Sequence, residues 1–160
     1  MTGTRAWAYW TFVALLVLLN FTLHLALGLQ AAPDLLTVAV LIAARRLGGA
    51  AAAGLGFALG LLRDALSLVA FGADAVTLTL VGFLGARSRD LFIGESLAFL
   101  GVYLFIGKWL HDTIYYLVAG RSMRGDAVVN LLIEAPLASL YAAVAGVIAV
   151  LLYRLVTGER

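Results

Sequence analysis

Seven ionisable side chains interrupt otherwise apolar stretches of the sequence: His24, Arg63, Asp64, Lys108, His111, Asp112 and Glu134. A charge within hydrocarbon is costly, so each of these residues needs an ionic partner or water. At about 1.5 Å of helix rise per residue, all of them fall in one layer in the outer half of a bilayer. The layer holds two fixed positive and three acidic side chains, and Lys108 and Asp112 are one helical turn apart and can pair.

Two interpretations of this polar layer stay open. The one we favour is a structural pairing network or a water-filled vestibule, and the other is a polar cavity that binds a small molecule, or a proton relay. A metal site is not indicated, because His24 is too distant from His111 and Asp112 to complete a metal-binding motif. The serines lack a flanking signature such as G-x-S-x-G. We therefore expect no catalytic residue, no metal and no cofactor.

The amino-acid composition indicates that these charged residues belong to a membrane protein. The 160 residues are 64% hydrophobic and only 12% charged, whereas a soluble domain carries about 25% charged residues. This indicates an integral membrane protein with no room for a soluble domain. The chain has no cysteine, which excludes disulfides and thiol chemistry. A net charge of +2 is too small to indicate nucleic-acid binding.

The apolar stretches predict one all-α transmembrane domain over residues 1–160. We expect six helices, at about 6–29, 35–44, 50–70, 75–86, 92–119 and 127–156. The second and fourth are shorter than the roughly 20 residues of a crossing, so they must thin the bilayer, pack against neighbours or stop part-way. The first is longer than the roughly 7–15 apolar residues of a signal peptide, so we expect it to be retained.

The basic residues predict the orientation of the chain through the positive-inside rule. With the N-terminus in the cytoplasm, only Arg121 and Arg124 lie outside. Both termini are therefore expected in the cytoplasm. The basic residues on that side are Arg5, Arg45, Arg46, Arg87, Arg89, Arg154 and Arg160.

Small residues repeat every fourth position on two of the expected helices. The stripes are Ala52, Gly56 and Gly60, and Ala138, Ala142 and Gly146. Such stripes let helix backbones approach closely. They indicate either packing within the chain, which the general richness in alanine and glycine favours, or docking of a partner's transmembrane helix.

An ordered set of residues across the second to fourth helices carries a family resemblance. It comprises Pro33-Asp34, then Gly56-Phe57-x-x-Gly60-Leu61-x-x-Asp64, then Gly72, then Gly82-Phe83-Leu84-Gly85. This set resembles the bacterial rod shape-determining protein family MreD. It covers about a third of the chain, from Pro33 to Ala86, and Arg63 departs from the pattern. The rest of the chain agrees in length and in helix number.

The resemblance implies a fold and a function. It implies a six-helix bundle similar to the S components of energy-coupling factor transporters. It also implies a multi-pass, non-enzymatic scaffold subunit of the cell-elongation (rod) complex in the bacterial inner membrane, supporting cell-shape control and peptidoglycan synthesis. The expected partner is the membrane helix of MreC, and through it MreB, RodA and the class B penicillin-binding protein. We expect one or the other of the two small-residue stripes to contribute to MreC binding in the lipid bilayer.

Two other functions are alternatives to the scaffold. The runner-up is the substrate-binding S component of a vitamin transporter, with the outer polar layer lining its cavity. The first helix reads Ala14-Leu15-Leu16-Val17-Leu18 and lacks the A-x-x-x-A pattern with which such components dock their coupling subunit. The third is a membrane enzyme acting on lipid-linked precursors through Asp64, Asp112 and Glu134, for which the sequence has no phosphate or metal motif. We favour the scaffold.

Overall fold

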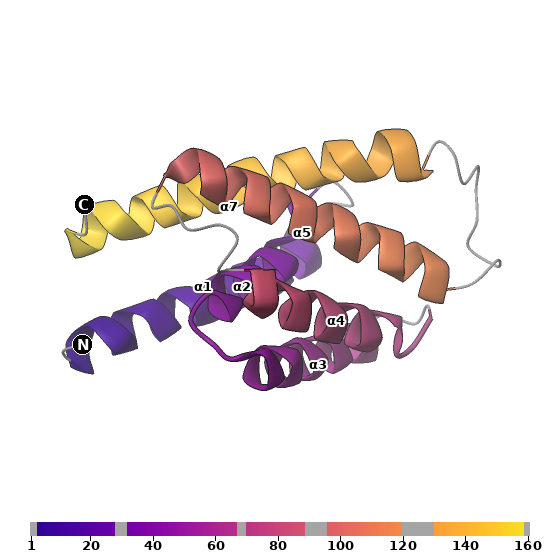
Figure 1. The fold of residues 1–160 in the computed structure, drawn as a ribbon, viewed down its shortest axis with the longest axis horizontal. Helices are drawn as coiled ribbons and strands as arrows, with labels where there is room; N and C mark the ends of the chain where they lie inside the picture. Colours follow the sequence, from indigo (N-terminus) through magenta and orange to yellow (C-terminus); the bar gives the residue numbers. More distant parts are fainter. Residues whose placement is uncertain (1–2, 28–31, 67–69, 89–95, 120–129, 159–160) are drawn as a thin grey trace.

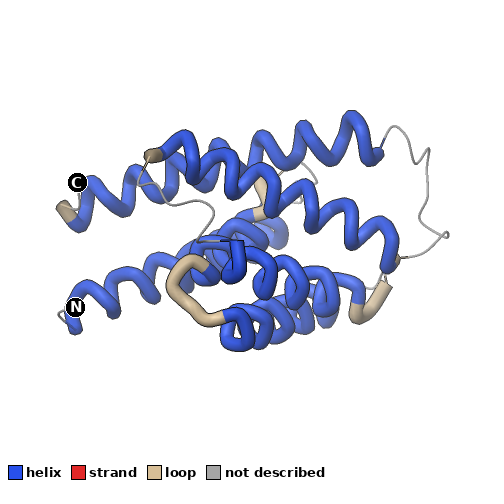
Figure 2. The backbone as a smooth tube through the Cα atoms, in the orientation of Figure 1, coloured by secondary structure: helices blue, strands red, loops and turns tan. Residues whose placement is uncertain are grey.

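The computed structural model describes residues 3–27, 32–66, 70–88, 96–119 and 130–158, and these are helical with short turns. The α-helices are α1 (Gly3–Leu27), α2 (Leu35–Ala44), α3 (Gly49–Leu66), α4 (Ala73–Ser88), α5 (Leu97–Val118) and α7 (Ala135–Thr157), and a π-helical turn, η2 (Asn130–Glu134), leads into α7 (Figures 1 and 2). The prediction of an all-helical chain with six helices is confirmed for this part of the chain.

The surface of the bundle is apolar and its interior holds charges. Large side chains such as Leu18 and Leu155 are 64% and 78% exposed, whereas Asp64 is 1% exposed. In the part of the chain that the structure describes, three segments are long and apolar enough to cross a membrane: Ala6–His24, Gly49–Leu66 and Leu131–Thr157. An apolar exterior around buried charges is the arrangement of a helical membrane protein, which agrees with the composition.

Helix α2 is the centre of the bundle. All ten of its residues are buried, and it contacts α1, α3, α4, α5 and α7. The prediction of a short helix over 35–44 is confirmed, and of the three explanations for its length, packing against neighbours is the one observed. A fully buried helix is apolar on every side, as Leu35–Ala44 is.

Helices α3 and α4 form a tightly packed antiparallel pair because glycines remove the side chains between them. A Cβ atom added at Gly56 would lie 2.1 Å from the carbonyl oxygen of Leu78, and one at Gly60 would lie 2.4 Å from the Cα of Ala75. Ala52 is fully buried in the same interface. Of the two interpretations of this stripe, packing within the chain is the one observed, because α4 of the same chain covers Ala52, Gly56 and Gly60.

The second stripe is divided between the core and the surface. Ala142 and Gly146 are buried on α7, and a Cβ atom at Gly146 would lie 2.6 Å from Cδ1 of Leu104. Ala138 is exposed. Two of these residues thus pack within the chain, against α5 and α2, and only Ala138 lies where a partner could reach it.

Several helix boundaries differ from the prediction. Helix α3 ends at Leu66, and Ala70 has a φ of 50°, so the helix does not continue to residue 70. Helix α4 is longer than predicted, at 16 residues. Helix α5 begins at Leu97, because Ser96 is extended and its hydroxyl accepts a hydrogen bond from the amide of Ala98. The predicted helical residues 28–29, 67–69, 92–95 and 127–129 lie outside the described residues.

The start of α1 and the end of α7 lie at the same end of the bundle, opposite the α3–α4 turn (Figure 1). Arg87 and Arg154 stand in the last turns of α4 and α7. Arg45 and Arg46 follow α2 directly. We call this the basic end. The placement of Arg89, Arg121, Arg124 and Arg160, and of the Arg5 side chain, lies outside what the structure describes.

Candidate functional site

Six ionisable residues from four elements meet at the end of the bundle opposite the basic end. They come from the residue that precedes α2, from the last turn of α3, from the first turn of α4 and from the second half of α5. We call them the ion-pair cluster: Asp34, Arg63, Asp74, Lys108, His111 and Asp112. Their elements share this height because α2 and α4 begin, and α3 ends, at the same end of the bundle.

Arg63 joins α3 to both α2 and α4. Its Nη1 donates to Oδ2 of Asp34 at 3.0 Å, and its Nε lies 3.3 Å from Oδ2 of Asp74. Asp34 is also the N-cap of α2, because its carboxylate accepts hydrogen bonds from the Thr37 amide at 3.1 Å and the Thr37 hydroxyl at 2.9 Å. One carboxylate thus starts the central helix and fixes α3 beside it.

Helix α5 contributes the other half of the cluster. The Nζ atom of Lys108 lies 3.3 Å from Oδ2 of Asp34 and also pairs directly with Asp112 one turn later. The ring of His111 lies between two carboxylates. Its Nδ1 is 3.1 Å from Asp112 and its Nε2 is 3.4 Å from Oδ1 of Asp74. The second contact is within ion-pair distance, but the two atoms do not have hydrogen-bonding geometry.

Asp64 lies beside the cluster and has a separate task. Its two carboxylate oxygens accept hydrogen bonds from the backbone amides of Asp74 at 3.2 Å and Ala75 at 2.9 Å. These amides belong to the first turn of α4, where unpaired N–H groups and the positive end of the helix dipole favour an anion. Asp64 therefore caps α4 from α3. Adjacent Arg63 points elsewhere, as the angle of about 100° between successive helical residues requires.

The charges of the cluster can balance. Asp34, Asp74 and Asp112 carry three negative charges, Arg63 and Lys108 supply two positive ones, and His111 supplies the third when both its ring nitrogens are protonated. Such balance is what makes burial of charges tolerable. Asp34 lies outside the helices: burial opposes its ionisation, but the charges of Arg63 and Lys108 hold the pKa of this carboxyl well below its usual range.

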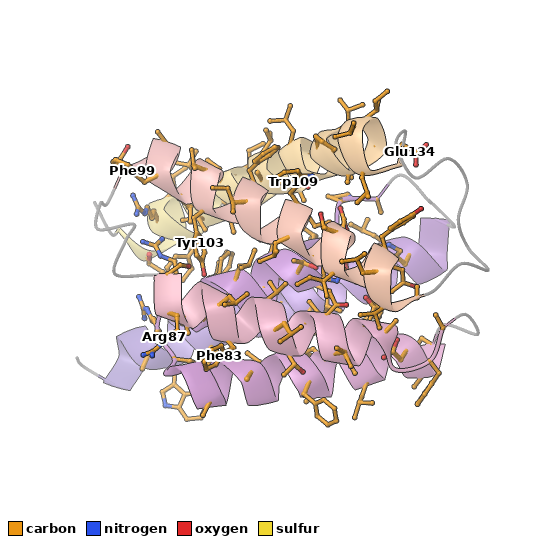
Figure 3. The ribbon with its side chains drawn as sticks, turned by 45° about the vertical axis from the view of Figure 1, so that its right-hand side comes forward. Phe83, Arg87, Phe99, Tyr103, Trp109 and Glu134 are labelled. Carbon is orange, nitrogen blue, oxygen red and sulfur yellow. The ribbon has the colours of Figure 1, made fainter. Side chains whose placement is uncertain are left out.

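The structure brings together five of the seven residues expected in the polar layer: Arg63, Asp64, Lys108, His111 and Asp112. His24 is outside the cluster, because it is exposed and its Nδ1 pairs with the carbonyl of Asn20 on its own helix at 2.8 Å. Glu134 is also outside. It is exposed in η2, and Figure 3 shows it at the far end of the molecule from Arg87. Estimated depth placed both residues in the layer, but depth does not fix the direction in which a side chain points.

Two members of the cluster, Asp34 and Asp74, were not among the expected residues because both lie just outside the predicted helices, 35–44 and 75–86. A signal for each was present: an aspartate directly before or within the first turn of an apolar helix is typical of helix N-termini. Asp34 precedes Leu35–Ala44, and Asp74 is the second residue of α4. If the N-termini of both helices had been placed at the same depth, the carboxylates of Asp34 and Asp74 would have been added to the expected polar layer.

The cluster binds the helices of this chain to one another. Each of its side chains lies within ion-pair distance of another member, so four elements are joined at one level. Within the described residues, no group of three or more histidine, aspartate or glutamate side chains is arranged to hold a metal ion. The arrangement favours the structural pairing interpretation over a substrate cavity.

Comparison of the chain with protein-family models, with curated proteins and with solved structures found no match. The function proposed below therefore rests on the motif residues and on the geometry of the bundle.

Proposed function

We propose that this protein is a non-enzymatic scaffold subunit of the bacterial cell-elongation complex, similar to MreD. In this proposal it binds the transmembrane helix of MreC and acts through MreC on MreB, RodA and the class B penicillin-binding protein. It lies in the inner membrane as a multi-pass protein with the basic end in the cytoplasm, as the positive-inside rule favours.

The observation that carries the proposal is the role of the residues that form the family motif. Asp34 caps α2 and binds Arg63. Asp64 caps α4. Gly72 has a φ of 93° in the turn between α3 and α4, a conformation that favours glycine. The ordered motif therefore coincides with the contacts that hold α2, α3 and α4 together.

The glycines of the motif support the same conclusion. Gly56 and Gly60 admit the backbone of α4, and a Cβ atom at Gly82 would lie 2.5 Å from the carbonyl oxygen of Ala52. Gly56, Gly60 and Gly82 are thus at contacts where a side chain would meet backbone, and a Cβ atom at Gly85 would meet the side chains of Tyr103 and Leu41. A chance set of glycines in alanine-rich membrane helices would not be expected to lie at close helix contacts at all four of these positions.

We place the MreC helix in an apolar groove between α5 and α7. This α5–α7 groove has a volume of about 410 Å³ and small residues at its floor, among them Gly101 and Ala143. Small residues let helices approach closely in a bilayer. We assign to this groove the binding of the MreC helix that the sequence suggested for Ala52, Gly56 and Gly60, because α4 covers those three residues. It is lined by Ala98, Gly101, Val102, Phe105, Leu140, Ala143, Val144, Val147 and Ile148.

The ion-pair cluster favours this proposal over a vitamin-binding S component. A vitamin cavity in the polar layer would need polar groups that are free to bind the ligand. Lys108 instead contacts both Asp34 and Asp112, and Arg63 contacts both Asp34 and Asp74. These side chains would have to break buried ion pairs in order to hold a ligand, which is costly.

Co-purification with MreC in a mild detergent tests the proposal. The wild-type chain should retain MreC, and Gly101→Leu should lower the retained amount by at least about fivefold because a leucine side chain enters the α5–α7 groove. A Cβ atom at Gly101 lies 3.7 Å from Val147, an ordinary contact, so the backbone there need not move.

Gly54→Leu is the matched control, because Gly54 is exposed on α3 and a Cβ atom there has no neighbour within 4 Å. It should retain MreC as the wild type does. A wild-type chain that retains no MreC, and purifies instead with a bound vitamin or with an ATP-driven coupling subunit, contradicts the proposed function. Equal retention by Gly101→Leu and wild type contradicts only the placement in the groove.

A further inference from the structure

A second groove runs between α4 and α5 and opens to the membrane side of the bundle. This α4–α5 groove has a volume of about 390 Å³, within the range of about 300–1,000 Å³ that is common for small-molecule sites. Its walls include Leu84 and Ile106, which are 43% and 45% exposed. Its end toward the basic end of the bundle is formed by Arg87 and Ser88.

The α4–α5 groove forms where two glycines, one on α4 and one on α5, pack directly against the central helix α2. A Cβ atom at Gly107 would lie 2.5 Å from Cδ1 of Leu41, and one at Gly85 would lie 3.2 Å from Cδ2 of the same leucine. Because glycine has no side chain, α4 and α5 approach α2 closely at these positions. The space that larger side chains would fill remains open as the groove. The hydroxyl of Tyr103 donates to the carbonyl oxygen of Leu41 at 2.9 Å, so this polar group is already satisfied and the wall stays apolar.

Arg87 makes one end of the groove positively charged. It is exposed in the last turn of α4, and within the described residues it makes no ion pair. Figure 3 shows Arg87 and Tyr103 on neighbouring helices at the same end of the molecule. The site is thus apolar along its length and cationic where the chain is expected to meet the membrane surface.

We propose that the α4–α5 groove binds an anionic phospholipid. One acyl chain lies along Leu84 and Ile106, and the phosphate group accepts charge-assisted hydrogen bonds from the guanidinium of Arg87. Basic pockets between transmembrane helices on the cytoplasmic side are known binding places for anionic headgroups. A partner's apolar helix in the same groove would leave Arg87 without an anion, which is why a lipid fits the charge better.

Native mass spectrometry of the purified chain tests this inference. The probe is a detergent solution with equal amounts of phosphatidylglycerol and phosphatidylcholine. The wild type should carry more phosphatidylglycerol. Arg87→Gln should lower the ratio of bound phosphatidylglycerol to phosphatidylcholine about fivefold, as expected for one cation near a headgroup. Arg154→Gln, at the same basic end but on α7 and outside the groove, is the matched control and should keep the ratio.

A further variant tests the acyl-chain part of the site. Ile106→Trp should lower the binding of both lipids, because the larger ring fills the groove. Equal losses in Arg87→Gln and Arg154→Gln would contradict the inference, since they would show attraction to the whole basic end. Unchanged lipid binding in Ile106→Trp would also contradict it. The substituted positions are all at least part-exposed, and an unfolding temperature equal to that of the wild type shows that each variant is folded.

Discussion

Replacing Gly56 by alanine should separate α3 from α4. The new Cβ atom would lie 2.1 Å from the carbonyl oxygen of Leu78 and 2.6 Å from its carbonyl carbon, whereas an ordinary contact is at least 3.4 Å. The obstacle is backbone, so no rotation of a side chain relieves it. The helices must move apart by about 1.3 Å, the difference between 3.4 Å and 2.1 Å. This movement loosens the contacts at Gly60 and Gly82 as well.

The expected loss of stability follows from two opposing effects. Inserting a methyl group into a well-packed interface costs about 1–3 kcal/mol. Glycine to alanine in a helix otherwise stabilises by up to about 1 kcal/mol. Gly54, half a turn earlier, has no atom within 4 Å of an added Cβ, so Gly54→Ala keeps only the favourable effect. Because the favourable effect is common to both variants, they should differ in free energy of unfolding by the packing cost alone, about 1–3 kcal/mol.

The measurement is denaturant unfolding of each variant, purified alone in mild detergent and followed by tryptophan fluorescence. Gly56→Ala should unfold at a lower denaturant concentration than wild type, and Gly54→Ala at the same or a higher one. Equal midpoints for the two variants would refute the packing argument. Gly56→Ala that is as stable as wild type but loses MreC would show that this glycine faces a partner after all.

Three other predictions concern the buried charges. Asp64→Ala removes both acceptors at the start of α4 and should cost at least about 2 kcal/mol in unfolding experiments; a cost below about 0.5 kcal/mol would show that the cap is dispensable. Arg63→Met leaves the carboxylates of Asp34 and Asp74 with one cation fewer and should lower the free energy of unfolding by about 3–5 kcal/mol. Adding Asp74→Asn should restore part of this stability. No recovery in the double variant would argue against the pairing of Arg63 with Asp74. Because the pKa of Asp34 is lowered in the folded protein, its stabilising effect is fully present above the ordinary carboxyl pKa of about 4 and is lost as pH falls through the lower folded pKa. Unfolding midpoints measured across that acid range should fall less steeply for Asp34→Asn than for wild type, and parallel curves would contradict the assignment.

The apolar pattern was enough to predict the helices but not all their ends. The central helix was predicted over its full observed range, Leu35–Ala44, because its turn signals are sharp on both sides. The predicted helix 75–86 leaves out Asp74, although a carboxylate is favourable in the first turn of a helix, and α4 begins at Ala73. The start of α5 is set by the cap at Ser96, a local contact that hydrophobicity does not report.

The candidate site was predictable only where its contacts are local. Lys108 and Asp112 pair within one helix, at a spacing the sequence shows. The pairs of Arg63 with Asp34 and Asp74 depend on which helices are neighbours, and this is fixed by the central position of α2. Small-residue stripes have the same limit: a G-x-x-x-G spacing indicates a close helix contact, but it does not say whether the second helix belongs to the same chain.

Cross-linking in intact cells would test MreC binding most directly. Because the chain has no cysteine, a single cysteine can carry a photoreactive group at Val102 in the α5–α7 groove, or at Phe57 on the exposed side of α3 as the control. We predict an adduct with the mass of the chain plus MreC from position 102 and not from position 57. No MreC adduct from position 102, or equal adducts from both positions, would contradict binding of MreC in this groove.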